Sequence, residues 1–199
     1  MFKTKADKLL SLAARRQLVT AADAAKLGIP RTYLPRLAYR GQLERIARGL
    51  YTSPAFFPTE HGSLVEALYQ VSNGILCLLS ALRFHNLTTQ SPHEVWVAIE
   101  HRAWKPNVSS PPIRFVRMSG PALQFGVSEH HVSGAAVHVF TPAKTIADCF
   151  KFRNKIGLDV AIEGLKESRR LKKASMDEIW AAAKVCRVSN VIRPYLESL

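Results

Sequence analysis

The spacing of apolar residues along the first part of the chain predicts three short helices. Leucine and alanine residues recur three and four positions apart over 5–16, which places them on one face of a helix. Thr20 can cap a second helix that ends before Gly28, because its hydroxyl can accept a hydrogen bond from an amide of the first turn. A third helix is expected to begin near Thr32, so that Pro35 falls in its first turn, where a missing N–H costs no helical hydrogen bond.

Two short β-rich segments follow the third helix and predict a hairpin. The run 43–52 reads as two strands around a turn that contains Gly49. Three helices and a basic hairpin are the elements of a winged helix-turn-helix, whose third helix reads bases in the major groove of DNA. We therefore expect a DNA-binding domain over residues 1–55.

The rest of the chain alternates helical and β-rich segments. A proline-bounded segment, residues 53–59, is a candidate linker, and we place the domain boundary near residue 55. The fold class is therefore α+β: an N-terminal winged helix-turn-helix, residues 1–55, followed by a mixed α/β domain, residues 56–199. The expected helices of the second domain span 60–71, 75–84, 142–153, 157–170 and 175–185, and the expected strands span 94–99, 113–118, 127–132 and 136–140.

The charge of the chain narrows the range of partners, because it is strongly positive and concentrated near the N-terminus. The 199 residues include 28 Lys and Arg against 15 Asp and Glu, a net charge of +13. Residues 1–58 hold 11 of these basic residues and 3 of the acidic ones, hence more than half of the excess. This excess favours an anionic partner, and nucleic acid fits the expected fold. The alternatives are a three-helix bundle whose arginines are merely solvated, and a winged helix that binds protein.

Candidate DNA contacts come from the third helix and the hairpin. Tyr33, Arg36 and Arg40 are spaced three and four residues apart, and form a polar stripe distinct from the apolar one. In a winged helix, Arg45 and Arg48 of the hairpin would lie along phosphates or in the minor groove.

Motifs of common enzymes are missing from the sequence. Gly62-Ser63 could begin a nucleotidyltransferase motif, but no aspartate lies between it and Asp148 to hold a metal ion. The β-rich region has no Glu-x-Lys, and no Walker loop, nucleophile elbow or dinucleotide-binding motif occurs. We therefore expect neither an enzyme nor a cofactor.

A metal site is also disfavoured. Neighbouring residues of a strand point to opposite faces, so His130 and His131 do not easily chelate one ion, even with His138 nearby. For Asp148, we favour an ion pair or a helix-packing role over that of a lone catalytic acid. If the second domain is nonetheless an enzyme, its candidate active-site residues are Glu129, His130, His131 and Asp148.

The cysteines and the apolar runs indicate a cytoplasmic protein with no membrane partner. The longest apolar run, over 74–82, falls well short of the roughly 20 residues that span a bilayer. Cys77, Cys149 and Cys186 are odd in number and far apart, which fits neither a disulfide framework nor a paired-cysteine zinc site.

Three groups of residues, taken in order, resemble the AbiEi family of antitoxins. They are Leu37-x-x-x-Gly41-x-Leu43-x-x-Ile46-x-x-Gly49-Leu50-Tyr51, Leu79-Ser80-Ala81-Leu82-x-x-His85-x-Leu87-Thr88, and Val139-x-Thr141-Pro142-x-Lys144-Thr145-x-x-Asp148-Cys149-Phe150. The resemblance implies an antitoxin domain over 56–199 and a cognate nucleotidyltransferase toxin, in a type IV toxin–antitoxin system of abortive-infection phage defence. It also implies repression of the chain's own operon through inverted repeats in the promoter, with two copies on the DNA, and it requires no stable complex with the toxin.

The resemblance also assigns residues to these roles. It maps Arg31, Thr32, Tyr33, Arg36 and Arg40 to the DNA-reading helix, and Arg45 and Arg48 to the wing. A basic cluster of the second domain is a candidate for extra nucleic-acid contact or for antitoxin activity: Lys166, Arg169, Arg170, Lys172 and Lys173. Two alternatives stay open, a nucleic-acid-processing enzyme and a stand-alone regulator without a toxin.

Overall fold

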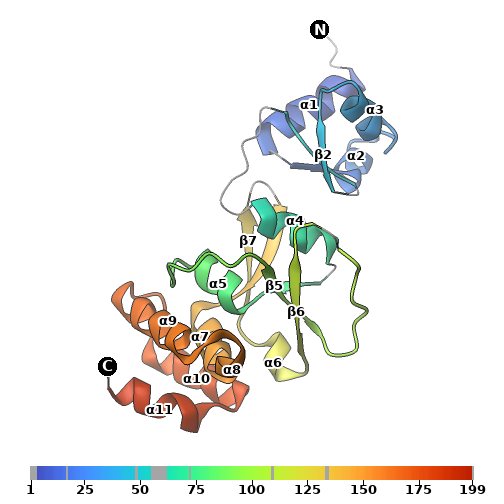
Figure 1. The fold of residues 1–199 in the computed structure, drawn as a ribbon. Helices are drawn as coiled ribbons and strands as arrows, with labels where there is room; N and C mark the ends of the chain where they lie inside the picture. The colour runs from blue at the N-terminus through green and yellow to red at the C-terminus, as the bar shows by residue number, and fades with distance from the viewer. Residues whose placement is uncertain are drawn as a thin grey trace. The chain divides into compact units, whose positions relative to one another are not determined.

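The computed structural model describes residues 4–16, 18–47, 49–54, 62–71, 73–108, 110–132 and 135–198. These residues divide into two compact units (Figure 1). The first unit is Met1–Gln70 together with His131–Ala136, and the second is Val71–His130 together with Val137–Leu199. The domain boundary expected near residue 55 lies outside the described residues, and the contacts divide the chain at Gln70.

The first unit contains the predicted helices and hairpin and one strand that the sequence analysis missed. This strand, β1, pairs with β3 in antiparallel fashion and sets Val19 opposite Tyr51. The sheet order is β1-β3-β2, so the hairpin gains a third strand. The elements are α1 (Lys5–Arg16), β1 (Leu18–Thr20), α2 (Ala21–Lys26), α3 (Tyr33–Tyr39), β2 (Glu44–Ala47), β3 (Leu50–Thr52) and α4 (Gly62–Gln70).

One apolar core joins the helices to the sheet in the first unit. The expected cap of α2 is confirmed: the Thr20 hydroxyl accepts a hydrogen bond from the Asp23 amide, and the Asp23 carboxylate accepts one from the Thr20 amide. This capping box fixes the start of α2 directly after β1. The core residues are Leu9, Ala13, Val19, Ala24, Ile29, Leu34, Leu37, Leu43 and Tyr51.

The second unit is built on a five-stranded sheet of mixed direction, in the order β6-β5-β4-β8-β7. The central strand corrects the sequence analysis, because residues 75 and 76 form β4 and not the start of a helix; the helix begins only at Leu78. A short, fully buried apolar run does not distinguish a strand from a helix by its periodicity. The strands are β4 (Ile75–Leu76), β5 (Val95–Glu100), β6 (Ile113–Met118), β7 (Val127–Val132) and β8 (Ala135–Phe140).

Helix α7 is the centre of the second unit. Every residue from Ala143 to Phe150 is buried, because α5, α9 and α10 all pack against this helix. Figure 1 shows α7 to α11 gathered as an orange and red group beside the C-terminus. The sequence analysis did not expect α6, α8 and α11. The helices are α5 (Leu78–Phe84), α6 (Pro121–Gln124), α7 (Pro142–Lys151), α8 (Arg153–Ile156), α9 (Leu158–Arg170), α10 (Met176–Cys186) and α11 (Ser189–Glu197).

None of the helices in the described parts of the chain combines the length and the apolar character needed to cross a lipid bilayer.

Candidate nucleic-acid interface

Helix α3 presents a continuous exposed stripe. Its residues recur three and four positions apart and therefore share one helical face. The other face holds Leu34 and Leu37, which are buried in the core. The core thus anchors α3 by one side and leaves the other side open to a partner. The exposed stripe consists of Thr32, Pro35, Arg36, Tyr39 and Arg40.

Two tyrosines of α3 differ in what they can contact. Tyr33, a predicted DNA contact, is half-buried and packs against the apolar core. Tyr39, which the sequence analysis left out, is 95% exposed. Its position three residues after Arg36 was the signal that could have found it. Arg31, also a predicted contact, is exposed in the turn that leads into α3.

Pro35 lies in the first turn of α3, as expected. The helix begins at Tyr33, so proline occupies its third position. The amides of Tyr33 and Leu34 bond back to the carbonyl oxygens of Pro30 and Arg31, at 3.0 and 3.4 Å. The proline ring therefore breaks no helical hydrogen bond and lies on the exposed face.

The wing is the hairpin of β2 and β3. Arg45 is exposed, and its Nε donates a hydrogen bond to the carbonyl oxygen of Ala47 at 3.3 Å. The pairing register shifts between these two residues, which indicates a β-bulge in β2. Gly49 follows with φ +83°, a conformation that favours glycine. Arg48, the other predicted wing contact, lies outside the described residues.

The wing is fastened to two helices at Gly49. Its carbonyl oxygen accepts hydrogen bonds from the Ala21 amide at 3.3 Å and from the Tyr69 hydroxyl at 3.0 Å. Ala21 begins α2 and Tyr69 lies in α4, so one acceptor connects the turn to both helices. Burial raises the pKa of the Tyr69 phenol, and the nearby Asp23 carboxylate raises it further, so this donor keeps its proton at neutral pH.

This part of the chain matches a known family. Residues 7–54 match the family model described as "Transcriptional regulator, AbiEi antitoxin". We refer to residues 7–54 as the AbiEi-type domain, after the family model that they match. The matched segment runs from α1 through the wing and stops before α4. The description of this family names two roles, transcriptional regulation and antitoxin action.

The whole chain also has a structural neighbour. Its fold is similar to the crystal structure of the RV2827C protein from Mycobacterium tuberculosis, with a TM-score of 0.55 and 14% sequence identity. The similarity covers 99% of this chain and 82% of that one. At this identity the likeness concerns the fold alone. No curated protein matches the chain closely enough to count as a relative.

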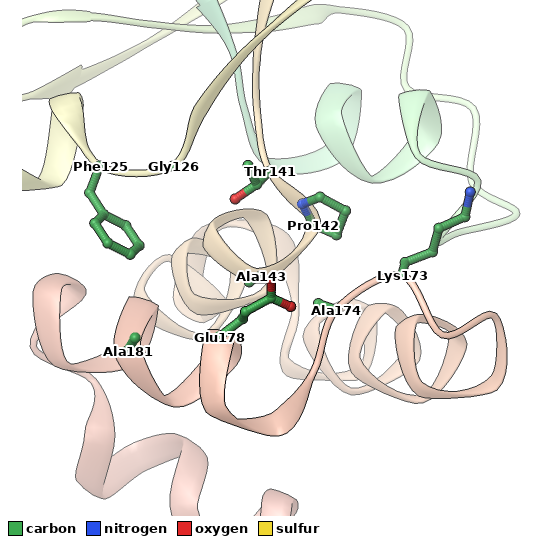
Figure 2. A pocket seen from close by; sticks show the side chains of 9 residues that line it. All are labelled: Phe125, Gly126, Thr141, Pro142, Ala143, Lys173, Ala174, Glu178 and Ala181. Carbon is green, nitrogen blue, oxygen red and sulfur yellow. The ribbon is translucent and has the colours of Figure 1, made fainter.

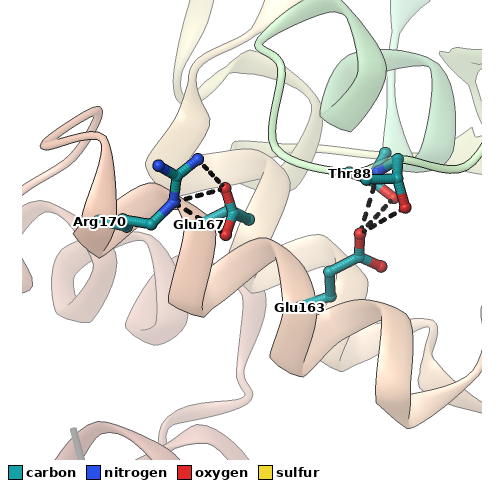
Figure 3. A network of polar contacts seen from close by, with 5 residues as sticks. Thr88, Glu163, Glu167 and Arg170 are labelled. Atoms are coloured by element: carbon teal, nitrogen blue, oxygen red, sulfur yellow. Dashed lines mark hydrogen bonds and ion pairs between the residues drawn. The ribbon is translucent and has the colours of Figure 1, made fainter.

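Beyond the AbiEi-type domain, the predicted basic cluster lies at the end of α9 and in the turn that follows. Arg170 is paired with Glu167, with Nη2 to Oε2 at 2.7 Å and Nε in contact with both carboxylate oxygens (Figure 3). These hydrogen bonds lower the pKa of Glu167. The pairing offsets the charge of Arg170, and the exposed cations that remain are Lys166, Arg169, Lys172 and Lys173.

A second carboxylate of α9 joins this helix to the segment after α5. One oxygen of Glu163 accepts hydrogen bonds from the Thr88 hydroxyl at 3.2 Å and from the Thr89 amide at 3.0 Å (Figure 3). These contacts hold the helix that carries the basic cluster against the body of the second unit.

A pocket of about 390 Å³ opens at the start of α7. Figure 2 shows Phe125 and Lys173 on opposite sides of it. Glu178, also at its wall, closes a capping box with Ser175, and the hydrogen bond from the Ser175 amide lowers the pKa of its carboxyl group. The wall is otherwise mostly apolar. Its residues are Phe125, Gly126, Thr141, Pro142, Ala143, Lys173, Ala174, Glu178 and Ala181.

Asp148 forms a buried ion pair with Lys144, which confirms the structural role expected for it. Both residues belong to α7, and both side chains are buried. The Lys144 ammonium nitrogen also lies 4.1 Å from the centroid of the Phe140 ring. The Cys186 thiol donates to the other carboxylate oxygen at 3.3 Å. Burial raises the pKa of Asp148, although the positive charge of Lys144 opposes the shift.

The other candidate enzyme residues take part in separate contacts. His130 packs edge to face against Phe84, with 4.9 Å between ring centroids. The Glu129 Oε2 atom lies 3.7 Å from the His138 Nε2 atom. His131 is exposed. Among the residues that the structure describes, no group of three or more His, Cys, Asp or Glu side chains could hold a metal ion.

Proposed function

We propose that the chain is a DNA-binding repressor of its own operon and an antitoxin. The observation that carries the first part is the exposed stripe of α3, which places Arg36, Tyr39 and Arg40 beside one another on a helix anchored by its core face. An α-helix fits the major groove of B-DNA, and arginine can bind guanine there through two hydrogen bonds.

The wing and α3 have different functions in this proposal. Arg45 is exposed on a hairpin that Gly49 ties to α2 and α4. A cation at this position contacts phosphates and strengthens binding to any sequence, whereas α3 supplies the sequence preference. An inverted repeat in the promoter matches two copies of the domain, one on each half-site.

The antitoxin part of the proposal rests on the family of the AbiEi-type domain. The cognate toxin would be a nucleotidyltransferase encoded by a neighbouring gene in a type IV system. The exposed cations at the end of α9, Lys166, Arg169, Lys172 and Lys173, are the surface that we assign to this role. Coexpression tests this part: the chain should restore growth to cells that express the neighbouring gene, and failure to do so would leave only the regulator.

The decisive experiment is fluorescence anisotropy with the full chain. The chain's own upstream DNA is compared with a scrambled duplex of the same composition, each at two salt concentrations. We expect a preference of about 10³-fold or more for the native duplex, within the range of specific readers. Equal, salt-sensitive binding to both duplexes would mean that the +13 net charge attracts DNA without sequence preference, and it would contradict the repressor role.

A further inference from the structure

The loop between β5 and β6, residues 101–112, carries an aromatic side chain that the AbiEi-type domain does not account for. Trp104 is 79% exposed, whereas Trp96 in β5 is only 4% exposed. Tryptophan offers a large, rigid apolar surface and is enriched where proteins bind other molecules. Its exposure leaves this apolar surface of the second unit available to a ligand.

The backbone next to Trp104 is fixed by the sheet. Arg117 of β6 donates from Nη1 to the carbonyl oxygen of Ala103 at 3.1 Å, and also to that of His101. The Ala103 amide bonds back to the carbonyl oxygen of Glu100 at 3.0 Å, which closes a turn at the end of β5. Figure 1 shows the loop leaving β5 and returning to β6. A platform held in this way loses little conformational entropy when a ligand binds.

The loop and its neighbouring strand are also positively charged. Residues 100–118 include four Arg and Lys and a single Glu. Arg102 and Lys105 stand on either side of Trp104 in the chain, and both are exposed. Lys105 Nζ lies 5.2 Å from the centroid of the Phe115 ring, which places this ammonium group over β6. Two exposed cations thus flank the exposed tryptophan in the chain.

We propose that Trp104, Arg102 and Lys105 form a binding site for single-stranded nucleic acid. An unpaired base has a free π-face that can stack on the indole, and the flanking phosphates can meet the two cations. A duplex lacks this free face, because its bases are stacked on one another inside the helix. The three residues belong to the second unit and not to α3, and the proposal does not depend on the proposed repressor function.

The position of the tryptophans gives this proposal its own optical signal. Trp96, Trp104 and Trp180 are the three tryptophans of the chain, and all lie after residue 70. Intrinsic tryptophan fluorescence therefore reports on the second unit and not on the AbiEi-type domain. We expect a thymidine oligonucleotide of about 12 residues, within the site sizes of single-strand binders, to quench the fluorescence of the full chain. The Trp104→Phe variant should lose this quenching.

Affinity is measured by anisotropy of the same labelled oligonucleotide and of a labelled duplex. Trp104→Ala should weaken single-strand binding by about tenfold, whereas Trp104→Phe, which keeps an aromatic face, should lose much less. Arg102→Gln with Lys105→Gln should weaken binding and flatten its salt dependence. Leu158→Ala is the control, because it removes an exposed large apolar side chain of the same unit that has no part in the proposed site, and it should leave single-strand binding unchanged.

The outcomes separate the proposal from its competitors. Since Trp104 is exposed, Trp104→Ala should keep the melting temperature of the parent chain, and a circular dichroism melt verifies this. Equal single-strand affinity of Trp104→Ala and the parent chain would overturn the proposal. So would an equal loss of single-strand and duplex binding. A loss of toxin neutralisation with unchanged oligonucleotide binding would assign the surface to a protein partner instead.

Discussion

The hydroxyl of Tyr69 donates a hydrogen bond to the carbonyl oxygen of Gly49 and so joins α4 to the turn of the wing. The family match ends at residue 54, so this contact comes from a helix that lies beyond it. The same glycine has little room for a side chain, since a Cβ atom there would lie 3.1 Å from the Tyr69 oxygen. The two residues therefore form one contact that positions the wing.

Tyr69→Phe tests this contact. Removal of the hydroxyl leaves the Gly49 oxygen with the Ala21 amide alone, so the free energy of unfolding should fall by about 0.5–1.5 kcal/mol. Duplex affinity should fall as well, because the wing is held less firmly. Urea denaturation and anisotropy measure the two effects. Tyr39→Phe is the control for stability, because its side chain is 95% exposed. An unchanged unfolding midpoint for Tyr69→Phe would show that the contact contributes nothing.

Arg36→Ala and Tyr39→Ala test the stripe of α3. Each should weaken binding to the native promoter by about 1–3 kcal/mol if its side chain contacts a base, with much less effect on a scrambled duplex. Tyr33→Phe should bind like the parent chain, since the Tyr33 ring packs against the core. Competition anisotropy against both duplexes measures the difference. Unchanged binding by Arg36→Ala and Tyr39→Ala would remove α3 as the reader.

Arg45→Gln tests the wing. Because phosphates carry no sequence information, the substitution should weaken binding to native and scrambled duplexes by the same factor. The slope of log affinity against log salt should become less steep by about 1, as expected for one lost phosphate contact. Titrations at four salt concentrations give the slope. A loss confined to the native duplex would mean that Arg45 contacts bases.

Lys144→Met tests the buried ion pair. It leaves the Asp148 carboxylate buried without its partner, so the free energy of unfolding at neutral pH should fall by about 3–5 kcal/mol. Burial already raises the pKa of Asp148, and removal of the ammonium group raises it further. A carboxyl group with a raised pKa favours the folded state when protonated, and this advantage is lost as pH rises through that pKa. The deficit of the variant should therefore shrink in acid.

Urea denaturation of Lys144→Met and the parent chain at several pH values between about 4 and 8 measures this dependence. The double variant Lys144→Met/Asp148→Leu supplies the control. With no charge left to bury, it should recover part of the stability and lose the pH dependence. If the unfolding free energy that Lys144→Met loses were the same at every pH, the loss would not come from the unpaired Asp148 carboxylate.

The three cysteines should be unreactive in the folded chain. All three are buried, and burial raises the pKa of Cys186 to about 12, with a further contribution from the Asp148 carboxylate. Only the thiolate attacks disulfide reagents, so labelling at pH 8 should be far slower than for a small-molecule thiol. Labelling in urea should recover three thiols. Rapid native labelling of any cysteine would show that the core opens readily.

Periodicity and capping signals predicted most of the helices, but they missed α6, α8 and α11 and the strands β1 and β4. Thr20 and Gly28 mark α2 correctly, because caps are local chemistry. The three residues of β1 form a strand through pairing with β3, which is distant in the chain. Ile75 and Leu76 belong to an apolar run whose buried neighbours decide between strand and helix. Tertiary contacts that the sequence does not display therefore fixed both strands.

The candidate interface shows the same limit at the level of single residues. The spacing of Arg36 and Arg40 indicated the exposed face of α3. The spacing alone did not separate Tyr33 from Tyr39, since each lies within four residues of an arginine. Their exposure follows from the direction in which the core lies, which depends on α1 and the sheet. The same holds for Trp104, whose exposure no local pattern announced.

The hydrogen bonds at the start of α3 determine which groups of this helix can bind an anion. The amides of Tyr33 and Leu34 already have carbonyl partners, and Pro35 has no amide hydrogen to offer. An anion therefore finds no free backbone donor at these three positions, where many helices bind phosphate. In the proposed complex with DNA, attraction must then come from side chains such as the guanidinium groups of Arg36 and Arg40. If α3 binds DNA as proposed, long and mobile side chains should make its phosphate contacts, and these contacts should weaken as the ionic strength rises.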